Sequence, residues 1–322
     1  MRAIPGESNL FLASPSAKIS TAEPALLVQH LQERALKTRL LSDFHIQYKL
    51  DKAKEDWFLD SIDQAPDIRV NRDLAPSGLF YDISLWSALV SHRFEGILRL
   101  MGKAELWVFL IPLAVFLAAF LALRRRIPKL GATTVAIAVV TTGFAGMSIN
   151  IILILAYQSL YGYVFQMIAL FIAFFMVGVA TGSTVTTRIT SRITNSKSLL
   201  IKLETFVLAH SILVPIILVI LHSYVGQPAV SVVFQIIIFV ISLVSGILVG
   251  SEFPLANKIY LKDTKRVGEV AGGLYACDLL GAWLGALIVS IWLIPVLGIV
   301  STCILIASLK IASLILVSTS KL

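Results

Sequence analysis

The residues best suited to chemistry in this 322-residue sequence are a few ionisable side chains inside long apolar runs. Glu204 and His210 share one run, Glu252 lies in a second just before Pro254, and Asp278 lies in a third. An ionisable group within a membrane-spanning segment is costly and is therefore a functional candidate. Because paired carboxylates suit cations and amines, Glu252 and Asp278 are candidates for a cation or polyamine site.

Structural roles compete with this interpretation. Lys202 lies two residues from Glu204 and would neutralise it, and Glu252 would pair with a basic residue of segment 258–266. We expect Asn150 to form a hydrogen bond between helices. The scattered histidines have neither metal-ligand spacing nor the spacing of a catalytic triad. We therefore expect no metal, no cofactor and no catalytic residue.

The elements that position these side chains belong to an apolar body behind a polar head. Hydrophobic residues make up 57% of the chain and charged residues 14%, whereas a soluble protein has about 25% charged residues. Residues 1–105 hold 13 basic and 14 acidic residues, and residues 106–322 hold 14 basic and 5 acidic ones. Both cysteines, Cys277 and Cys303, lie in apolar stretches, so no disulfide framework is expected.

The apolar body contains stretches long enough to cross a bilayer, which takes about 20 mostly apolar residues. These stretches are Leu106–Leu123, Ala132–Tyr157, Tyr161–Gly182, Leu199–His222, Ala229–Phe253, Gly273–Leu297 and Ile299–Val317. The sequence therefore predicts a mainly α-helical, polytopic membrane bundle of about seven spans over residues 106–322.

Basic residues alternate between the linkers of this bundle. Loops 124–129, 188–202 and 258–266 carry four Lys or Arg each, and the linkers between them carry none. By the positive-inside rule, the basic loops are cytoplasmic. We expect an integral protein of the bacterial inner (plasma) membrane that contacts the lipid bilayer and no nucleic acid. An odd number of spans would put residues 1–105 outside the cytoplasm, and the sequence leaves their side open.

Three pairs of glycines have the small-xxx-small spacing that lets helix backbones approach closely. They are Gly178 and Gly182, Gly246 and Gly250, and Gly281 and Gly285. We favour packing within the chain over a gating or oligomer interface. The recurrence of the pairs is a faint sign of an internal repeat, a feature of many transporters.

The head has the pattern of a small α/β segment over residues 1–78. Residues 8–13 predict a short buried strand, and helices are expected from Pro24 and after Asp51. Residues 79–105 predict an amphipathic linker helix at the membrane surface. One strand and two helices suit the edge of a larger domain better than a complete one.

Several runs resemble membrane proteins fused to a spermidine synthase-like domain. In the body they are Gly143–Gln158, Leu160–Tyr163, Phe175–Ser183, Leu274–Gly285 and Ile294–Gly298. In the head, Asn9–Ser14 resembles a late strand of the aminopropyltransferase fold, Ser42–Tyr48 the segment after it, and Asn71–Pro76 the closing loop. The resemblance implies that the head is the end of a Rossmann-like aminopropyltransferase domain. Asn150 stands where related membrane segments often carry Glu.

The resemblance also points to what the head lacks. Enzymes of the family bind decarboxylated S-adenosylmethionine on a Gly-rich turn after the first strand, and no such turn occurs here. We therefore expect the C-terminal portion of such a protein, not catalytic alone, that works with a separate chain supplying the missing half or is a remnant. Two alternatives are a transporter for polyamines or other cations and a structural membrane anchor.

Overall fold

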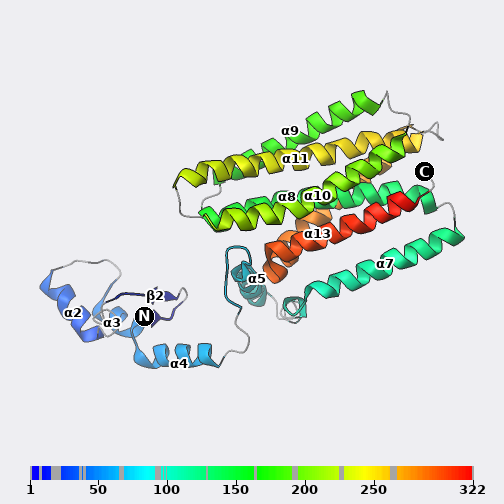
Figure 1. Cartoon of the computed structure of the whole chain (residues 1–322). Coiled ribbons are helices and arrows are strands. Elements are labelled where there is room, and N and C mark those ends of the chain that lie inside the picture. The colour runs from blue at the N-terminus through cyan, green and yellow to red at the C-terminus, as the bar shows by residue number, and fades with distance from the viewer. Residues whose placement is uncertain are drawn as a thin grey trace. The chain divides into compact units, whose positions relative to one another are not determined.

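The computed structural model divides the chain into two compact units, Met1–Arg69 and Val70–Leu322 (Figure 1). The residues it describes are 2–6, 9–15, 23–35, 38, 41–64, 69–90, 96, 98, 100–127, 130–162, 165–190, 195–224, 228–261 and 267–320. The division falls after residue 69 rather than after residue 78, because the segment that follows is bonded to the helical bundle. Leu74 accepts a hydrogen bond from the amide of Ile299 at 2.9 Å, and Asp73 pairs with His222 at 3.2 Å.

In its described residues, the first unit has a two-stranded sheet and three helices. Strand β1 (Arg2–Ile4) pairs antiparallel with β2 (Leu10–Leu12). The helices are α2 (Pro24–Glu33), α3 (Asp43–Lys49) and α4 (Lys52–Asp63). The side chains of Ser42 and Asp51 cap α3 and α4. The strand predicted at residues 8–13 is present in shortened form, but its expected burial is wrong, because Leu10 and Phe11 are more than half exposed. Its partner β1 is too short to show a pattern in the sequence.

The second unit is a bundle of helices with a short helix before it. That short helix is α5 (Ser77–Val90). The bundle comprises α7 (Leu106–Arg126), α8 (Leu130–Tyr161), α9 (Phe165–Thr190), α10 (Ser196–His222), α11 (Pro228–Leu261), α12 (Val267–Ile288), the π-helical turn η1 (Val289–Leu293) and α13 (Ile294–Thr319). The expected linker helix thus begins at Ser77, and residues 91–95 lie outside the described part of the chain.

Six helical segments in the described part of the chain are long and apolar enough to cross a membrane. The last of them, Val267–Thr319, joins the two stretches expected as separate sixth and seventh spans. It is interrupted at Gly298, whose φ of 79° and ψ of 173° are not helical. Glycine is the residue that adopts this conformation readily.

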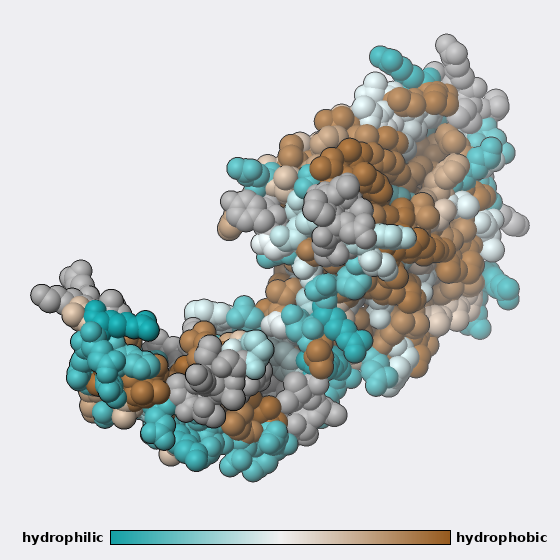
Figure 2. All heavy atoms as spheres, turned by 60° about the vertical axis from the view of Figure 1, so that its left-hand side comes forward, coloured by the Kyte–Doolittle hydropathy of each residue, from teal (hydrophilic) through white to brown (hydrophobic). Residues whose placement is uncertain are grey.

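The outer surface of the bundle is apolar. Helix α7 has no buried residue, although its mean hydropathy is high. Large apolar side chains such as Phe116, Phe206 and Trp283 are more than half exposed. Figure 2 shows large areas of hydrophobic residues on the face of the bundle that it presents. Such a surface suits lipid, and the fold is that of a multi-pass membrane protein.

Successive helices of the bundle alternate in direction, as their contacts show (Figure 1). Asn150 of α8 meets Ser242 of α11, and Gly146 approaches Val249, so α8 and α11 are antiparallel. Helices α9 and α11 are parallel, as are α8 and α12, through their glycines. Lys197 at the start of α10 binds the end of α13, so these two helices are antiparallel.

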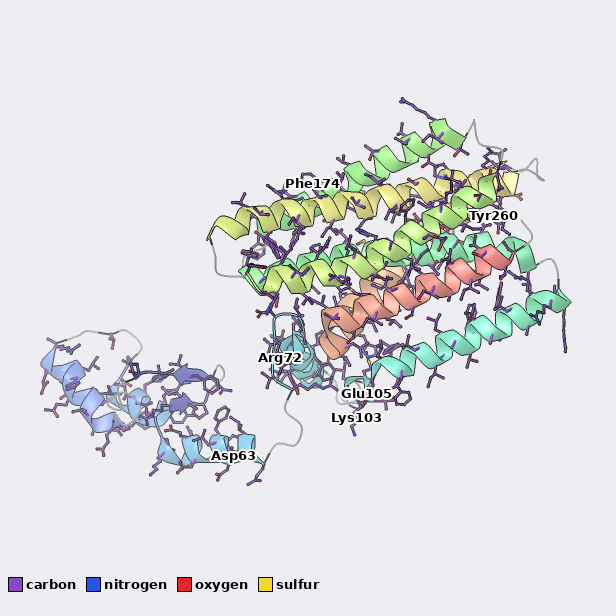
Figure 3. All side chains as sticks on the ribbon, viewed as in Figure 1. Asp63, Arg72, Lys103, Glu105, Phe174 and Tyr260 are labelled. Carbon is purple, nitrogen blue, oxygen red and sulfur yellow. The ribbon has the colours of Figure 1, made fainter. Side chains whose placement is uncertain are left out.

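The alternation gives the bundle two distinct ends. The basic end carries the described parts of loops 124–129, 188–202 and 258–266, and the opposite end carries Asp73 and the start of α7. Figure 3 labels Tyr260 at the basic end and Lys103 and Glu105 at the other.

Basic side chains cap helix C-termini at the basic end. Arg124 donates to the carbonyl oxygens of Leu316 and Thr319 at 3.0 and 2.9 Å, and Lys258 donates to that of Thr190. Cations are favoured there because the last carbonyls of a helix carry partial negative charge.

Candidate functional site

A buried ion pair joins α13 to α10 inside the bundle. The Nζ atom of Lys310 lies 2.8 Å from Oε2 of Glu204 and 2.9 Å from Oε1, and both side chains are completely enclosed. Two hydroxyl groups of α8 complete the shell of Lys310, with Thr142 at 2.6 Å and Thr141 at 3.3 Å. An ammonium group has three hydrogens to donate. The carboxylate and the two hydroxyls use all of them.

A second carboxyl group faces the same cluster. Glu252 of α11 is 2% exposed and lies beside Thr142, Glu204 and Lys310. Among the described residues, no donor is in hydrogen-bonding geometry with either of its oxygens. Lys310 has no hydrogen left to donate to Glu252. When all three groups of the ionic cluster (Glu204, Glu252 and Lys310) are ionised, two negative charges therefore face one positive charge. Burying an unpaired carboxylate costs several kcal/mol, so Glu252 is the group of this cluster best suited to bind a proton or a counter-cation.

The local sequence explains how Glu252 reaches the cluster. We expected Pro254 to stop the helix, but α11 continues through it to Leu261. Membrane helices tolerate an internal proline because neighbouring groups satisfy the carbonyl that it frees. Glu252 therefore lies within a continuous helix, where it faces α8 and α10.

The structure contradicts one expected pairing and tests another only in part. The expectation that Lys202 neutralises Glu204 is wrong, because both oxygens of Glu204 lie against Lys310. Glu252 forms no hydrogen bond with the described part of segment 258–266, and residues 262–266 lie outside the described residues. The sequence indicated Lys310 only by its position in the middle of an apolar run, where a lysine needs a polar partner.

Further polar contacts lie deeper in the bundle. The Nε2 atom of His210 on α10 is 2.7 Å from the hydroxyl of Ser245 on α11. Ser242, one turn away, donates to Asn150 on α8 at 3.2 Å and to the carbonyl of Phe171 on α9 at 3.0 Å. Asn150 thus takes part in a hydrogen-bonded link between three helices.

Asp278 lies apart from the ionic cluster in the contacts of the described residues. It is half-buried on α12 and packs against Gly143 of α8. A Cβ atom at Gly143 would lie 2.5 Å from the main-chain oxygen of Asp278 and 2.7 Å from Oδ1. No described contact joins Asp278 to Glu252.

All three glycine pairs lie in contacts within the chain. Gly178 and Gly182 of α9 pack against α11, and Gly246 and Gly250 of α11 pack against α9. Gly281 and Gly285 of α12 pack against α8. An added Cβ atom at any of the six would lie 2.1 to 2.6 Å from a backbone oxygen, so these contacts require glycine.

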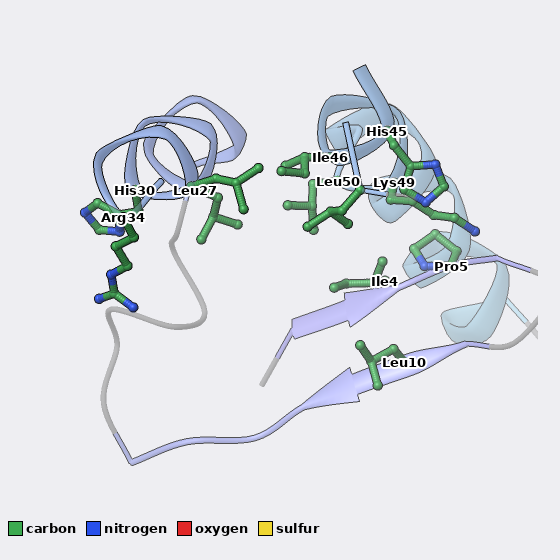
Figure 4. Close-up of a pocket in the computed structure, with 12 residues that line it drawn as sticks. Ile4, Pro5, Leu10, Leu27, His30, Arg34, His45, Ile46, Lys49 and Leu50 are labelled. Atoms are coloured by element: carbon green, nitrogen blue, oxygen red, sulfur yellow. The ribbon is translucent and has the colours of Figure 1, made fainter. Parts of the chain in front are cut away.

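The first unit contains an apolar cavity of about 530 Å³ between its helices and its sheet (Figure 4). Leu27 of α2 points towards Ile46 and Leu50, and Ile4 and Leu10 of the sheet lie below them. His30, Arg34, His45 and Lys49 add basic groups at its margin. In the described residues no group of three acidic, histidine or cysteine side chains is placed to hold a metal ion.

Comparisons of the chain with protein-family models, with curated proteins and with solved structures found no match.

Proposed function

We propose that residues 70–322 form a membrane transport protein and that the ionic cluster is its cation-binding site. The observation that supports this most is Glu252, a buried carboxyl group for which the described residues supply no cation of its own, beside a lysine that is already paired with Glu204. A purely structural ion pair needs one carboxylate for one ammonium. A second carboxylate in the interior of a membrane bundle is a feature of proton and ion pathways.

The charge and the enclosure of the cluster favour a small ligand. Two carboxylates and one ammonium leave room for a single positive charge. Glu252 is enclosed on all sides, and a proton is the cation that needs no cavity. We therefore propose proton binding at Glu252, and a polyamine is the alternative substrate.

We further propose seven membrane crossings, with a turn at Gly298 separating the sixth from the seventh. Gly298 is not helical, and α13 runs antiparallel to α10 and parallel to α7, as a seventh span would. With the basic loops in the cytoplasm, residues 70–105 lie on the other side of the membrane.

Proton movement in liposomes tests the proposal. The full chain is reconstituted with a pH-sensitive dye inside, and an outward gradient of K⁺ with valinomycin drives proton entry. We expect flux in the wild type and its loss in Glu252→Gln. Glu269→Gln changes an exposed carboxylate on α12 and serves as the matched control.

Two results would contradict the assignment. Unchanged proton flux in Glu252→Gln removes the proton site. Uptake of labelled spermidine that depends on Glu252, in the absence of proton flux, replaces the proton with a polyamine.

A second candidate function concerns the first unit. We propose that it docks a separate chain that supplies the cofactor-binding half of a spermidine synthase-like assembly. Among its described residues, Ala3 and Ile46 are the buried apolar ones, whereas Phe11, Phe44 and Trp57 are 51%, 76% and 68% exposed. So much exposed aromatic surface is typical of an interaction site.

Site-directed photo-crosslinking tests this docking. A photoreactive residue at Phe44 or Trp57 is expected to capture one specific chain, and one at Asp63 is the control. The absence of a crosslinked partner at both aromatic positions would contradict the proposal. A single cysteine at Ser61, probed with an impermeant thiol reagent, shows which side of the membrane that partner must occupy.

A further inference from the structure

The glycine contacts recur in the second unit with a constant shift in residue number. An added Cβ atom at Gly246 would meet the oxygen of Phe175 at 2.1 Å, and one at Gly143 would meet that of Asp278 at 2.5 Å. Gly246 lies 103 residues after Gly143, and Asp278 lies 103 residues after Phe175, so the two contacts are related by the same shift. Two further pairs of contacts obey the same shift: Gly178 to Leu243 with Gly281 to Val140, and Gly182 to Ile247 with Gly285 to Phe144.

The burial of the third pair of helices follows the same shift. Six buried residues of α10 have counterparts 103 positions later on α13 that are also buried. The pairs are Ser196 and Ile299, Leu200 and Cys303, Glu204 and Ala307, Val207 and Lys310, His210 and Ser313, and Val214 and Val317. Side chains of unlike chemistry thus occupy equivalent positions. The correspondence is therefore one of architecture.

Each helix runs in the direction opposite to its counterpart. Helices α8 and α11 are antiparallel, as are α10 and α13. Because α9 is parallel to α11 and α12 is parallel to α8, α9 and α12 are antiparallel too. When three helices correspond to three others that run in the opposite direction, the two groups are related by a two-fold axis in the membrane plane. The ion pair of Glu204 and Lys310 lies at this axis, because its counterpart, Ala307 and Val207, is one turn away on the same two helices.

Two apolar layers flank the ionic cluster and are related by the same shift. The basic-end layer consists of Val135, Ala138, Val139, Leu200, Leu255, Ala256, Leu274 and Val317. All but Val139 have a counterpart in the larger core cluster: Ile238, Ile241, Cys303, Ile152, Leu153, Phe171 and Val214, which we call the opposite-end layer. The opposite-end layer is bulkier, because it has Leu153 where the basic-end layer has Ala256, and Ile241 where that layer has Ala138. Tyr157 and Phe234 pack with it and add further bulk.

We infer that α8–α10 and α11–α13 are inverted-topology repeats and that the two apolar layers are gates through which the ionic cluster is reached from one membrane face at a time. The inference rests on the proposed function, because the gated ligand is the cation bound at Glu252. Transporters built from inverted repeats place their site at the repeat interface and expose it alternately. Here the thinner gate faces the basic end, so the cluster opens more readily to that face.

Exchanging gate residues between counterpart positions tests this design in the full chain. A cysteine at Thr141, beside Lys310, reports access in a background with Cys277→Ser and Cys303→Ala. An impermeant thiol reagent is applied to intact cells and to inverted vesicles. Ala256→Leu gives the basic-end gate the residue of its counterpart, and Leu153→Ala does the reverse.

We expect opposite effects on the two faces. Ala256→Leu lowers the labelling rate from the basic face, and Leu153→Ala raises it from the other face, each by about tenfold, as expected when one large side chain biases a two-state equilibrium. A second matched pair, Ala138→Ile and Ile241→Ala, is expected to act in the same directions and covers a failure of either first variant to fold.

The outcomes separate this inference from the proposed function. Equal changes on both faces, or none in either matched pair, overturn the gates. Face-specific changes together with full proton flux in Glu252→Gln would support the repeats and gates and refute the proton site.

Discussion

Lys310 and Glu204 are 106 residues apart in the sequence, and their charged groups lie 2.8 Å apart inside the bundle, where water does not reach them. Such a pair contributes little to stability relative to apolar residues of the same size, but losing one partner strands a charge. The pair therefore links the third helix of one repeat to the third helix of the other at a point where single substitutions are costly.

Lys310→Met is expected to lower the free energy of unfolding by about 3–5 kcal/mol, because Glu204 and Glu252 remain buried without a cation. Unfolding in detergent, followed by tryptophan fluorescence, measures the change. The double variant Lys310→Met with Glu204→Gln is expected to recover most of the loss. Wild-type stability in the single variant would show that the carboxylates tolerate burial without Lys310.

Gly246→Ala is expected to destabilise the bundle by about 1–3 kcal/mol, as overpacking of a tight contact does. The new methyl group would lie 2.1 Å from the oxygen of Phe175, so α9 and α11 must separate. Gly273→Ala on α12 is the matched control, because an added Cβ atom there meets nothing within 4 Å. Equal thermal stability of the two variants would contradict the close contact of α9 and α11.

Gly298→Ala is expected to destabilise the break within α13 by about 1–3 kcal/mol, the range for a side chain in a sparsely populated backbone region. The φ of 79° is unfavourable for alanine, and the methyl group would also press on Leu74 and Ala75 at 3.1 to 3.2 Å. Gly162→Ala separates the two causes, since its φ is 72° and its surroundings are open. Limited proteolysis near residue 298 and the melting temperature measure the loss of stability. A smaller loss of stability in Gly298→Ala than in Gly162→Ala would refute the packing contribution.

Single cysteines at the two ends of α7 are expected to be labelled from different sides of the membrane. In a background without Cys277 and Cys303, an impermeant reagent should reach Lys103→Cys in intact cells and Arg126→Cys after permeabilisation. The reason is that α7 runs parallel to the chain from η1 through α13, with Phe109 at Trp292 of η1 and Arg124 at Thr319 of α13. Labelling of both sites from the same side would mean that α7 does not cross.

The helices of the body were predictable from the sequence because a span is defined locally, by about 20 apolar residues. The helices of the structure extend beyond the predicted spans where polar residues continue a helix past the hydrocarbon, as at Lys258 in α11. The break at Gly298 was also placed correctly, since glycine followed by a new apolar run is a local signal. In contrast, the halt expected at Pro254 was wrong, because the surroundings of a membrane helix decide whether proline ends it.

The site was predictable only as a set of separate residues. Glu204, Glu252 and His210 stood out because each is an ionisable group in an apolar run, yet their partners lie on other helices. Nothing in the spacing of Glu204 points to Lys310 rather than to the nearer Lys202. The paired carboxylates expected at Glu252 and Asp278 are Glu252 and Glu204 in the structure. Helix packing, which the sequence pattern does not encode, makes that choice.

The order of Glu204, Glu252 and Lys310 in the sequence bears on how the bundle assembles. Glu204 and Glu252 both precede Lys310 in the sequence, so the growing chain holds two carboxylates without their cation from the synthesis of Glu252 until Lys310 is made. Helix α13, in turn, carries a charge that lipid alone does not accommodate. The ion pair therefore makes the stable insertion of α13 depend on the packing of α8, α10 and α11, which together supply the polar groups around Lys310.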